Sequence, residues 1–361
     1  MPDASSYGDA PQANTIANVA ERLGGLHLPN FEQLGLGRIT PIRGVAAVDS
    51  PVAAVGRLAE RSKGKDTITG HWEMAGIVTE IPFPTYPAGF PPDVVAAFSA
   101  ICGKPPLGNV PASGTEIIAE LGAEHQHTGR PILYTSADSV FQIAAHEAIV
   151  PLATLYEWCE QARAMLVPPN AVNRVIARPF VGTPGNYVRT PNRRDYAIPP
   201  PPSVLDRLAG RGIPVHAVGK ICDIYCGHGI ASSIRVVDNA DAVEKALAIV
   251  DAVEHGFIFV NLNDFDSKFG HRRDVRGYGA ALERLDAAIP QIRSRLRAGD
   301  GLLFTADHGC DTTAPGSDHT REYVPYIECG SIAGGDAGTL RGLGHIGERV
   351  AAILESGRVT A

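Results

Sequence analysis

The stretch Leu303-Phe304-Thr305-Ala306-Asp307-His308-Gly309 is a short apolar run that ends on an acid and a histidine. A second stretch has the same pattern, because the apolar residues 257–260 lead to Asp266 and His271. A third histidine, His319, follows in a loop rich in proline and glycine. Ligands of open parallel sheets bind at the carboxyl ends of the strands, so these stretches predict one shared site.

The five polar residues of these stretches are suited to binding metal ions. A lone acid or histidine is more often a surface or core residue, but here every member falls just past a strand or in the following loop. Mixed carboxylate and imidazole ligands favour manganese, zinc or iron over calcium. We therefore expect a pair of divalent metal ions, with the ligands Asp266, His271, Asp307, His308 and His319.

The bulk properties narrow the class of protein. The 361 residues are 44% apolar and 20% charged, as in a globular protein of one or two domains. A formal charge of -7 argues against a nucleic-acid partner, because binding to phosphate backbones needs a basic surface. The sequence contains no long apolar run and no signal-peptide pattern, so we expect no membrane contact. No obligatory protein partner is inferred.

Six scattered cysteines favour a reducing, cytoplasmic location over a disulfide framework. Cys222 and Cys226, with His228 nearby, have one residue more between them than the usual zinc-binding pair. Buried or incidental thiols are the favoured interpretation of these cysteines.

Strand and helix patterns alternate through the second half of the chain, which predicts an α/β fold. Such alternation is typical of a mostly parallel sheet with helices on both faces. Five prolines between positions 82 and 92 and the run Pro199–Pro202 bracket a segment with strands and a helix of its own. We interpret residues 83–197 as an inserted α+β cap domain. Residues 1–82 and 198–361 then form a discontinuous core.

A two-metal site for displacement at phosphorus needs a nucleophile, and Thr67 is the best candidate. It lies in the polar stretch Gly64-Lys65-Asp66-Thr67-Ile68-Thr69-Gly70, where Lys65 adds positive charge and the glycines permit close approach. The alternative is a threonine that only caps a loop. The tripeptide Lys65-Asp66-Thr67 alone does not decide between a nucleophile and a capping residue.

The cap segment contains five arginines on backbone rich in proline and glycine, which are suited to phosphate recognition. They are Arg174, Arg178, Arg189, Arg193 and Arg194, of which two or three are expected to be plain surface residues. Lys220, directly after a predicted strand, is a further phosphate candidate. Asp138 follows another strand and is suited either to holding a sugar hydroxyl or to capping a turn.

Several stretches together resemble the phosphopentomutases of the alkaline phosphatase superfamily. They are GKDTITGHWE, YTSADS, RVIARPFVG, RTPNRRDYA, DFDSKFGHRRD, TADHG and PGSDHTREYVP, spread over nearly the whole chain. The resemblance implies an alkaline-phosphatase-like core with an inserted cap and two manganese ions. It also implies that Thr67 becomes phosphorylated and that the five acids and histidines named above bind the metals. Positions around the sugar phosphate are matched by Ser136, Asp138, Arg174, Ile176, Arg189 and Lys220.

The implied reaction interconverts ribose 1-phosphate and ribose 5-phosphate, and the corresponding 2-deoxy sugars. It passes through a 1,5-bisphosphate, and a sugar bisphosphate is needed as activator. A related metal-dependent phosphatase or phosphotransferase, or an inactive relative, is the alternative. The family begins with an apolar strand that ends in a metal-binding aspartate, and this sequence begins just after that point. We therefore expect the native chain to start upstream of Met1.

Overall fold

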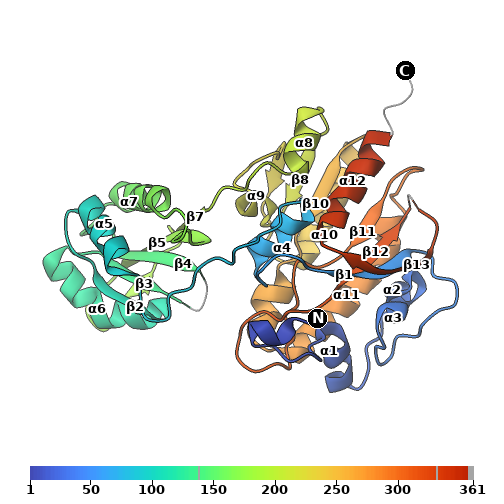
Figure 1. Ribbon diagram of the computed structural model, residues 1–361, viewed down its shortest axis with the longest axis horizontal. Coiled ribbons are helices and arrows are strands. Elements are labelled where there is room, and N and C mark those ends of the chain that lie inside the picture. The colour runs from blue at the N-terminus through green and yellow to red at the C-terminus, as the bar shows by residue number, and fades with distance from the viewer. Residues whose placement is uncertain (137–138, 331, 357–361) are drawn as a thin grey trace. The chain divides into compact units, whose positions relative to one another are not determined.

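The computed structural model of the protein describes residues 1–136, 139–330 and 332–356 (Figure 1). The chain divides into two compact units, one of Met1–Ile81 with Pro200–Ala361 and the other of Pro82–Pro199. Both boundaries fall at the proline-rich stretches of the sequence.

Among the described residues, the larger unit contains two sheets. In the four-stranded sheet the order is β11-β12-β1-β13, with only β1 and β13 parallel. In the three-stranded sheet the order is β10-β8-β9, and both pairs are parallel. The strands are β1 (Ala54–Ala59), β8 (Val215–Val218), β9 (Ser232–Ile234), β10 (Phe257–Val260), β11 (Leu302–Phe304), β12 (Val324–Cys329) and β13 (Gly335–Arg341).

Helices cover both faces of the four-stranded sheet. Successive side chains of a strand point to opposite faces, so each strand contacts helices on both sides. Val55 and Ile327 pack with residues of α1, α2 and α11, whereas Leu58 and Tyr326 pack with residues of α4 and α12. The helices are η1 (Ala4–Tyr7), α1 (Thr15–Leu23), α2 (Pro29–Leu34), α3 (Leu36–Ile39), α4 (Thr67–Met74), α8 (Val204–Gly210), α9 (Ile221–Ile224), α10 (Asn239–Ala252), η2 (Phe265–Gly270), α11 (Val275–Arg293) and α12 (Gly344–Ser356).

The smaller unit has one mixed sheet in the order β2-β3-β4-β5-β6, and β7 also pairs with β5. Leu133 and Phe141 pack with α5 and α7 on one face, while Ile132 and Tyr134 pack with α6 on the other. The elements are α5 (Pro92–Cys102), β2 (Leu107–Pro111), α6 (Gly114–Thr128), β3 (Ile132–Thr135), β4 (Val140–His146), α7 (Leu152–Met165), β5 (Arg174–Val181), β6 (Val188–Arg189) and β7 (Arg194–Ala197).

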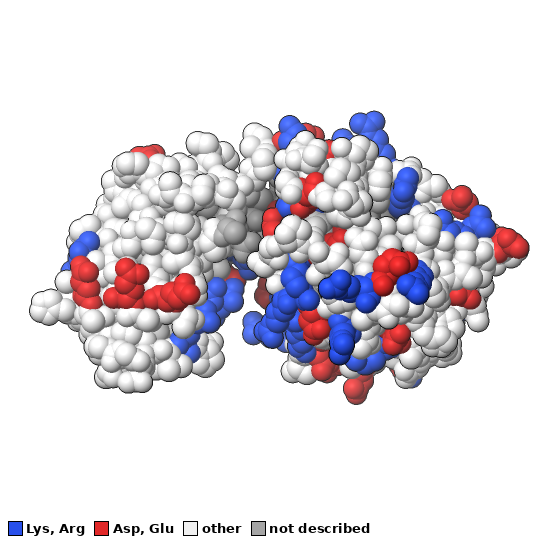
Figure 2. All heavy atoms as spheres, turned by 90° about the horizontal axis from the view of Figure 1, so that it is seen from below, with Lys and Arg blue, Asp and Glu red and all other residues white. Residues whose placement is uncertain are grey.

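The predicted α/β fold class is confirmed, with parallel and antiparallel pairs in the core. No helix among the described residues is long and apolar enough to span a membrane. On the face shown in Figure 2, acidic and basic side chains are interspersed over the larger unit.

Candidate active site

Asp266 lies between two imidazoles in the larger unit. It belongs to the short helix η2, and its Oδ1 is 3.0 Å from His319 Nε2 and 3.2 Å from His271 Nε2. His271 Nδ1 lies 2.6 Å from the carbonyl oxygen of Ser317. A donated Nδ1–H at that position leaves the Nε2 lone pair directed at the carboxylate, where a cation would bind.

Asp307 forms a second group of the same kind, just past β11. Its Oδ2 lies 3.3 Å from His308 Nε2 and 3.0 Å from His71 Nδ1. The rings of His308 and His319 stack with centroids 3.8 Å apart. The structure therefore brings all five predicted ligands into one continuous cluster, although they come from two separate stretches of the chain.

The donor set fits a divalent metal ion. Possible ligand atoms of Asp266, His308 and His319 lie within 4.8 Å of one another, and so do those of Asp266, His271 and Cys310. Hard carboxylate oxygen with imidazole nitrogen suits ions such as Mn²⁺ or Zn²⁺. Neither of these groups contains Cys222 or Cys226, and among the described residues no other such group occurs.

The acids of the cluster are held in their ionised form. Burial raises the pKa of Asp307, but the imidazoles of His308 and His71 outweigh it, and the pKa lies below its usual value. For Asp266 the hydrogen bond with His319 and the nearby imidazoles likewise overcome burial and lower the pKa. Ionised carboxylates in a buried site are prepared to bind a cation.

The pKa values of His308 and His319 are shifted in opposite directions. Burial lowers the pKa of His308 below its ordinary value despite the carboxylate of Asp307. Burial also disfavours the charged form of His319, but the hydrogen bond with Asp266 prevails, and the pKa of His319 is raised. An imidazole with a lowered pKa and one with a raised pKa thus lie stacked beside the same pair of acids.

Thr67 is the first residue of α4, where its hydroxyl reaches the cluster. The side chain of Asp66 caps this helix by accepting hydrogen bonds from the backbone N–H groups of Ile68 and Thr69. Thr67 Oγ1 lies 3.3 Å from His308 Nε2. The cap is therefore Asp66 and not Thr67, and the threonine hydroxyl is available to the cluster.

Close approach of α4 to the Asp307 segment depends on Gly70. A Cβ atom at Gly70 would lie only 2.0 Å from the carbonyl oxygen of Asp307. One turn along the helix from Thr67, His71 Nδ1 lies 2.9 Å from the carbonyl oxygen of Thr67 and also contacts Asp307. The second glycine of the GKDTITG stretch thus permits the contact that places Thr67.

Lys65 is paired with two acids. Its Nζ lies 3.0 Å from the carboxylate of Asp9 and 2.9 Å from Asp318 Oδ2, and it donates to the carbonyl oxygen of Tyr7. The ammonium therefore links the loop before Thr67 to the loop that carries His319. Its charge is balanced by these carboxylates.

A cavity of about 810 Å³ adjoins the site within the larger unit. It is lined by the apolar residues of β10 and β11 and of the helices α10, α11 and α12, and it reaches Thr67, Asp266 and Asp307. β10 and β11 are the edge strands of their sheets among the residues that the structure describes.

The predicted sugar-phosphate residues of the smaller unit that the structure describes lie in β5 and β6 or directly after β3. Arg174 and Ile176 lie in β5, and Arg174 pairs with Asp195 at 3.4 Å. Ile176 is buried, and Ser136 follows β3. Asp138 lies outside the described residues.

Arg189 lines a cavity of about 270 Å³ together with Arg178, Thr190 and Arg193. Burial lowers the pKa of Arg178, and the neighbouring Arg193 lowers it further. Guanidinium groups so close together favour an anionic ligand. Lys220, in the larger unit, immediately precedes α9.

Sequence reasoning missed several residues that contact the site. His71 and Asp318 were within quoted stretches, and the i, i+4 spacing of Thr67 and His71 was a usable signal. Asp9 and Cys310 carried no such signal, because their contacts are with residues far along the chain.

The fold and the carboxylate–imidazole cluster define a metal-dependent enzyme of the α/β class. The Metalloenzyme superfamily matches residues 20–356 of the chain. Relatives named phosphopentomutase come from Caldanaerobacter subterraneus (54% identical over 328 residues), Anaeromyxobacter dehalogenans (53% over 354) and Symbiobacterium thermophilum (54% over 358). The matches cover 91%, 97% and 98% of this chain and 83%, 91% and 91% of the relatives.

The chain belongs to the phosphopentomutase family within this superfamily. The expectation of an isomerase of this kind is confirmed, as is the resemblance on which it rested. The family and the ligand cluster together also support binding of a divalent metal.

Proposed function

We propose that the protein interconverts ribose 1-phosphate and ribose 5-phosphate, and their 2-deoxy forms, through a phosphorylated Thr67. The distance of 3.3 Å between Thr67 Oγ1 and His308 Nε2 carries this proposal, because it places a hydroxyl against the ligand cluster. The printed name of the relatives, phosphopentomutase, supplies the class of substrate.

Asp266, His271 and His319 would hold one Mn²⁺, and Asp307 and His308 would hold the second. When bound, the two cations would neutralise phosphoryl oxygens and lower the pKa of the threonine hydroxyl. The carboxylates are suited to this role because they are ionised and flanked by imidazoles.

In the forward reaction, phospho-Thr67 gives its phosphoryl group to the free hydroxyl of a sugar monophosphate. The Oγ1–P bond breaks, a bond from the sugar oxygen to phosphorus forms, and the proton of the sugar hydroxyl takes the place of the phosphoryl group on Thr67 Oγ1. The resulting 1,5-bisphosphate then returns its other phosphoryl group to Thr67. A sugar bisphosphate primes the enzyme by phosphorylating Thr67 at the start.

In these steps the residues around Thr67 hold its hydroxyl in position. Asp66 fixes the first turn of α4, and His71 and Gly70 hold this turn against Asp307. A nucleophile held in reactive geometry avoids the entropic cost of bringing the groups together. The ion pair between Lys65 and Asp318 holds the Asp318 loop beside the first turn of α4, and we propose this as the catalytic role of Lys65.

Recognition of the sugar phosphate is assigned to residues that the family resemblance matched. We propose that the 83–197 segment acts as a cap, with Arg189 and its neighbours binding phosphate. The full set is Ser136, Asp138, Arg174, Ile176, Arg189 and Lys220.

An assay with purified protein and Mn²⁺ tests the proposal. Ribose 1-phosphate, with catalytic ribose 1,5-bisphosphate, is expected to give ribose 5-phosphate without stoichiometric inorganic phosphate. Peptide mass spectrometry of the enzyme after turnover is expected to find the phosphoryl group on Thr67. Release of phosphate in proportion to substrate consumed would show a phosphatase instead.

A further inference from the structure

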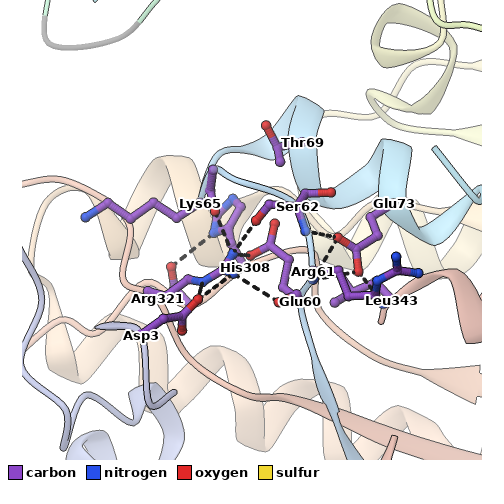
Figure 3. A network of polar contacts seen from close by, with 12 residues as sticks. Asp3, Glu60, Arg61, Ser62, Lys65, Thr69, Glu73, His308, Arg321 and Leu343 are labelled. Carbon is purple, nitrogen blue, oxygen red and sulfur yellow. Dashed lines mark hydrogen bonds and ion pairs between the residues drawn. The ribbon is translucent and has the colours of Figure 1, made fainter. Parts of the chain in front are cut away.

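A single buried arginine holds the loop that leads to the proposed nucleophile. This loop, residues 60–66, connects β1 to α4. Arg321 comes two residues after His319, and only 2% of its surface is exposed. Figure 3 shows its side chain among the polar groups of the loop.

The guanidinium binds three carbonyl oxygens of the loop at alternate positions. Nη1 donates to the carbonyl oxygens of Ser62 at 2.9 Å and Gly64 at 2.8 Å, and Nη2 donates to that of Glu60 at 3.0 Å. The five N–H donors of arginine form a rigid, planar fork. The loop backbone therefore wraps around one guanidinium group. The ammonium group of a lysine lacks this planar arrangement of donors and cannot make the same set of hydrogen bonds.

Two acids and an aromatic ring hold the guanidinium itself. Nη1 donates to Glu60 Oε2 at 2.5 Å, and Nε and Nη2 donate to Asp3 Oδ2 at 3.2 and 2.9 Å (Figure 3). The guanidinium carbon lies 4.6 Å from the centroid of the Tyr7 ring. A buried charge with its hydrogen bonds satisfied in this way is held rigidly.

The C-terminal end of the loop contacts α4, so the position of the loop also determines the position of the helix. A Cβ atom at Gly64 would lie 2.7 Å from Thr69 Oγ1, so the loop backbone lies directly against the first turn of the helix. Asp66 then accepts hydrogen bonds from the backbone N–H and the hydroxyl of Thr69. Movement of the carbonyls at 62 and 64 would therefore displace Thr67.

We propose that Arg321 is a positioning residue for phosphoryl transfer. Its guanidinium couples the loop of His319 to the loop of Thr67, and so sets the hydroxyl against His308. This inference rests on the proposed function, in which Thr67 accepts the phosphoryl group. It adds a group that lies outside the proposed metal ligands and the proposed sugar-phosphate residues.

The test compares Arg321→Lys with a matched substitution elsewhere. Arg349 pairs with the buried Glu328 through two hydrogen bonds, at 3.0 and 2.6 Å, and does not contact the loop. Arg321→Lys is expected to lower kcat by about 10²-fold with KM unchanged, because a small misplacement of a reacting group costs that much. Arg349→Lys, which alters two hydrogen bonds to a buried carboxylate, is expected to lower the melting temperature but to leave kcat unchanged.

Hydrogen exchange gives a reading that does not depend on activity. Amides of residues 60–70 are expected to exchange faster in Arg321→Lys, whereas those of α11 keep their wild-type rates. A wild-type kcat in Arg321→Lys, or an equal loss of kcat in Arg349→Lys, would overturn the proposal. If Thr67→Ala stays active but Arg321→Lys still shows faster exchange in the loop, the nucleophile assignment fails and the role of Arg321 in the loop stands.

A second variant covers the case in which Arg321→Lys does not fold. Asp3→Asn removes the charge of one partner of the guanidinium but leaves its bonds to the loop carbonyls, and Asp3 is partly exposed. A smaller fall in kcat with faster exchange at 60–66 is expected. Wild-type values of both would contradict the proposal.

Discussion

Thr67 Oγ1 lies 3.3 Å from His308 Nε2, although 241 positions separate the two residues. The contact joins the first turn of α4 to the segment that follows β11. It depends on Gly70, whose missing side chain lets α4 approach Asp307. This relationship connects the proposed nucleophile with the proposed metal ligands.

Replacing Thr67 with alanine is expected to abolish the mutase reaction. The hydroxyl is the proposed acceptor, so kcat should fall by at least about 10³-fold, as for loss of a covalent nucleophile. The measurement is formation of ribose 5-phosphate, together with circular dichroism to check the fold. Thr67→Ser, which keeps a hydroxyl, should retain measurable turnover and become phosphorylated. An active Thr67→Ala variant would refute the nucleophile assignment.

Removing the metal is expected to destabilise the wild-type protein but not a variant that lacks Asp266. A ligand at 100 times its Kd stabilises by about 2.7 kcal/mol, so Mn²⁺ should raise the melting temperature of the chelated wild type. Asp266→Asn should show little of this rise, because its carboxylate lies between two imidazoles. Asp251→Asn, at an exposed ion pair with Arg295, is the control and should respond as the wild type does.

Metal affinity is expected to fall as the pH falls. Despite burial, Asp266 raises the pKa of His319 in the metal-free protein, so its imidazole keeps a proton to higher pH. A cation binds the neutral imidazole and must displace that proton. Below this pKa the apparent affinity for Mn²⁺ should fall by up to about tenfold per pH unit. Titration calorimetry at several pH values measures this, and an affinity that rises on acidification would contradict it.

Arg189→Ala is expected to raise the KM for ribose 5-phosphate by about tenfold or more with a smaller change in kcat. Arg189 lines the small cavity with Arg178 and Arg193, where guanidinium groups gather. Steady-state kinetics provide the measurement. Arg43→Ala, at an exposed pair with Glu21, serves as the control. An unchanged KM in Arg189→Ala would remove this residue from the proposed phosphate site.

The cysteines are expected to react with a thiol reagent in an order set by burial. Cys226 is exposed and should react first in the native protein. Cys310 is buried beside Asp266, and burial raises its pKa to about 12, so it should stay unreacted until unfolding. Timed labelling followed by peptide mass spectrometry checks the order. Early labelling of Cys310 would show that the ligand cluster is open to solvent.

Parts of the fold followed directly from local patterns. The strands β3, β8, β10 and β11 were predicted, because each is a short, mainly apolar run that ends before a polar residue of the candidate site. The strands β1, β12 and β13 were not predicted. β12 includes Pro325 and the buried acid Glu328, and β13 contains two glycines, so neither shows the pattern of a regular strand.

The sequence by itself determined the family, the α/β class and the types of residue at the site, because these depend on local order and on residue chemistry. Only the tertiary structure decided which distant groups meet: the pairing of Asp307 with His71, of Asp266 with Cys310, and of Arg321 with the 60–66 loop. Such contacts join residues far apart in the chain, and their positions follow from packing of the whole core. No local pattern encodes them.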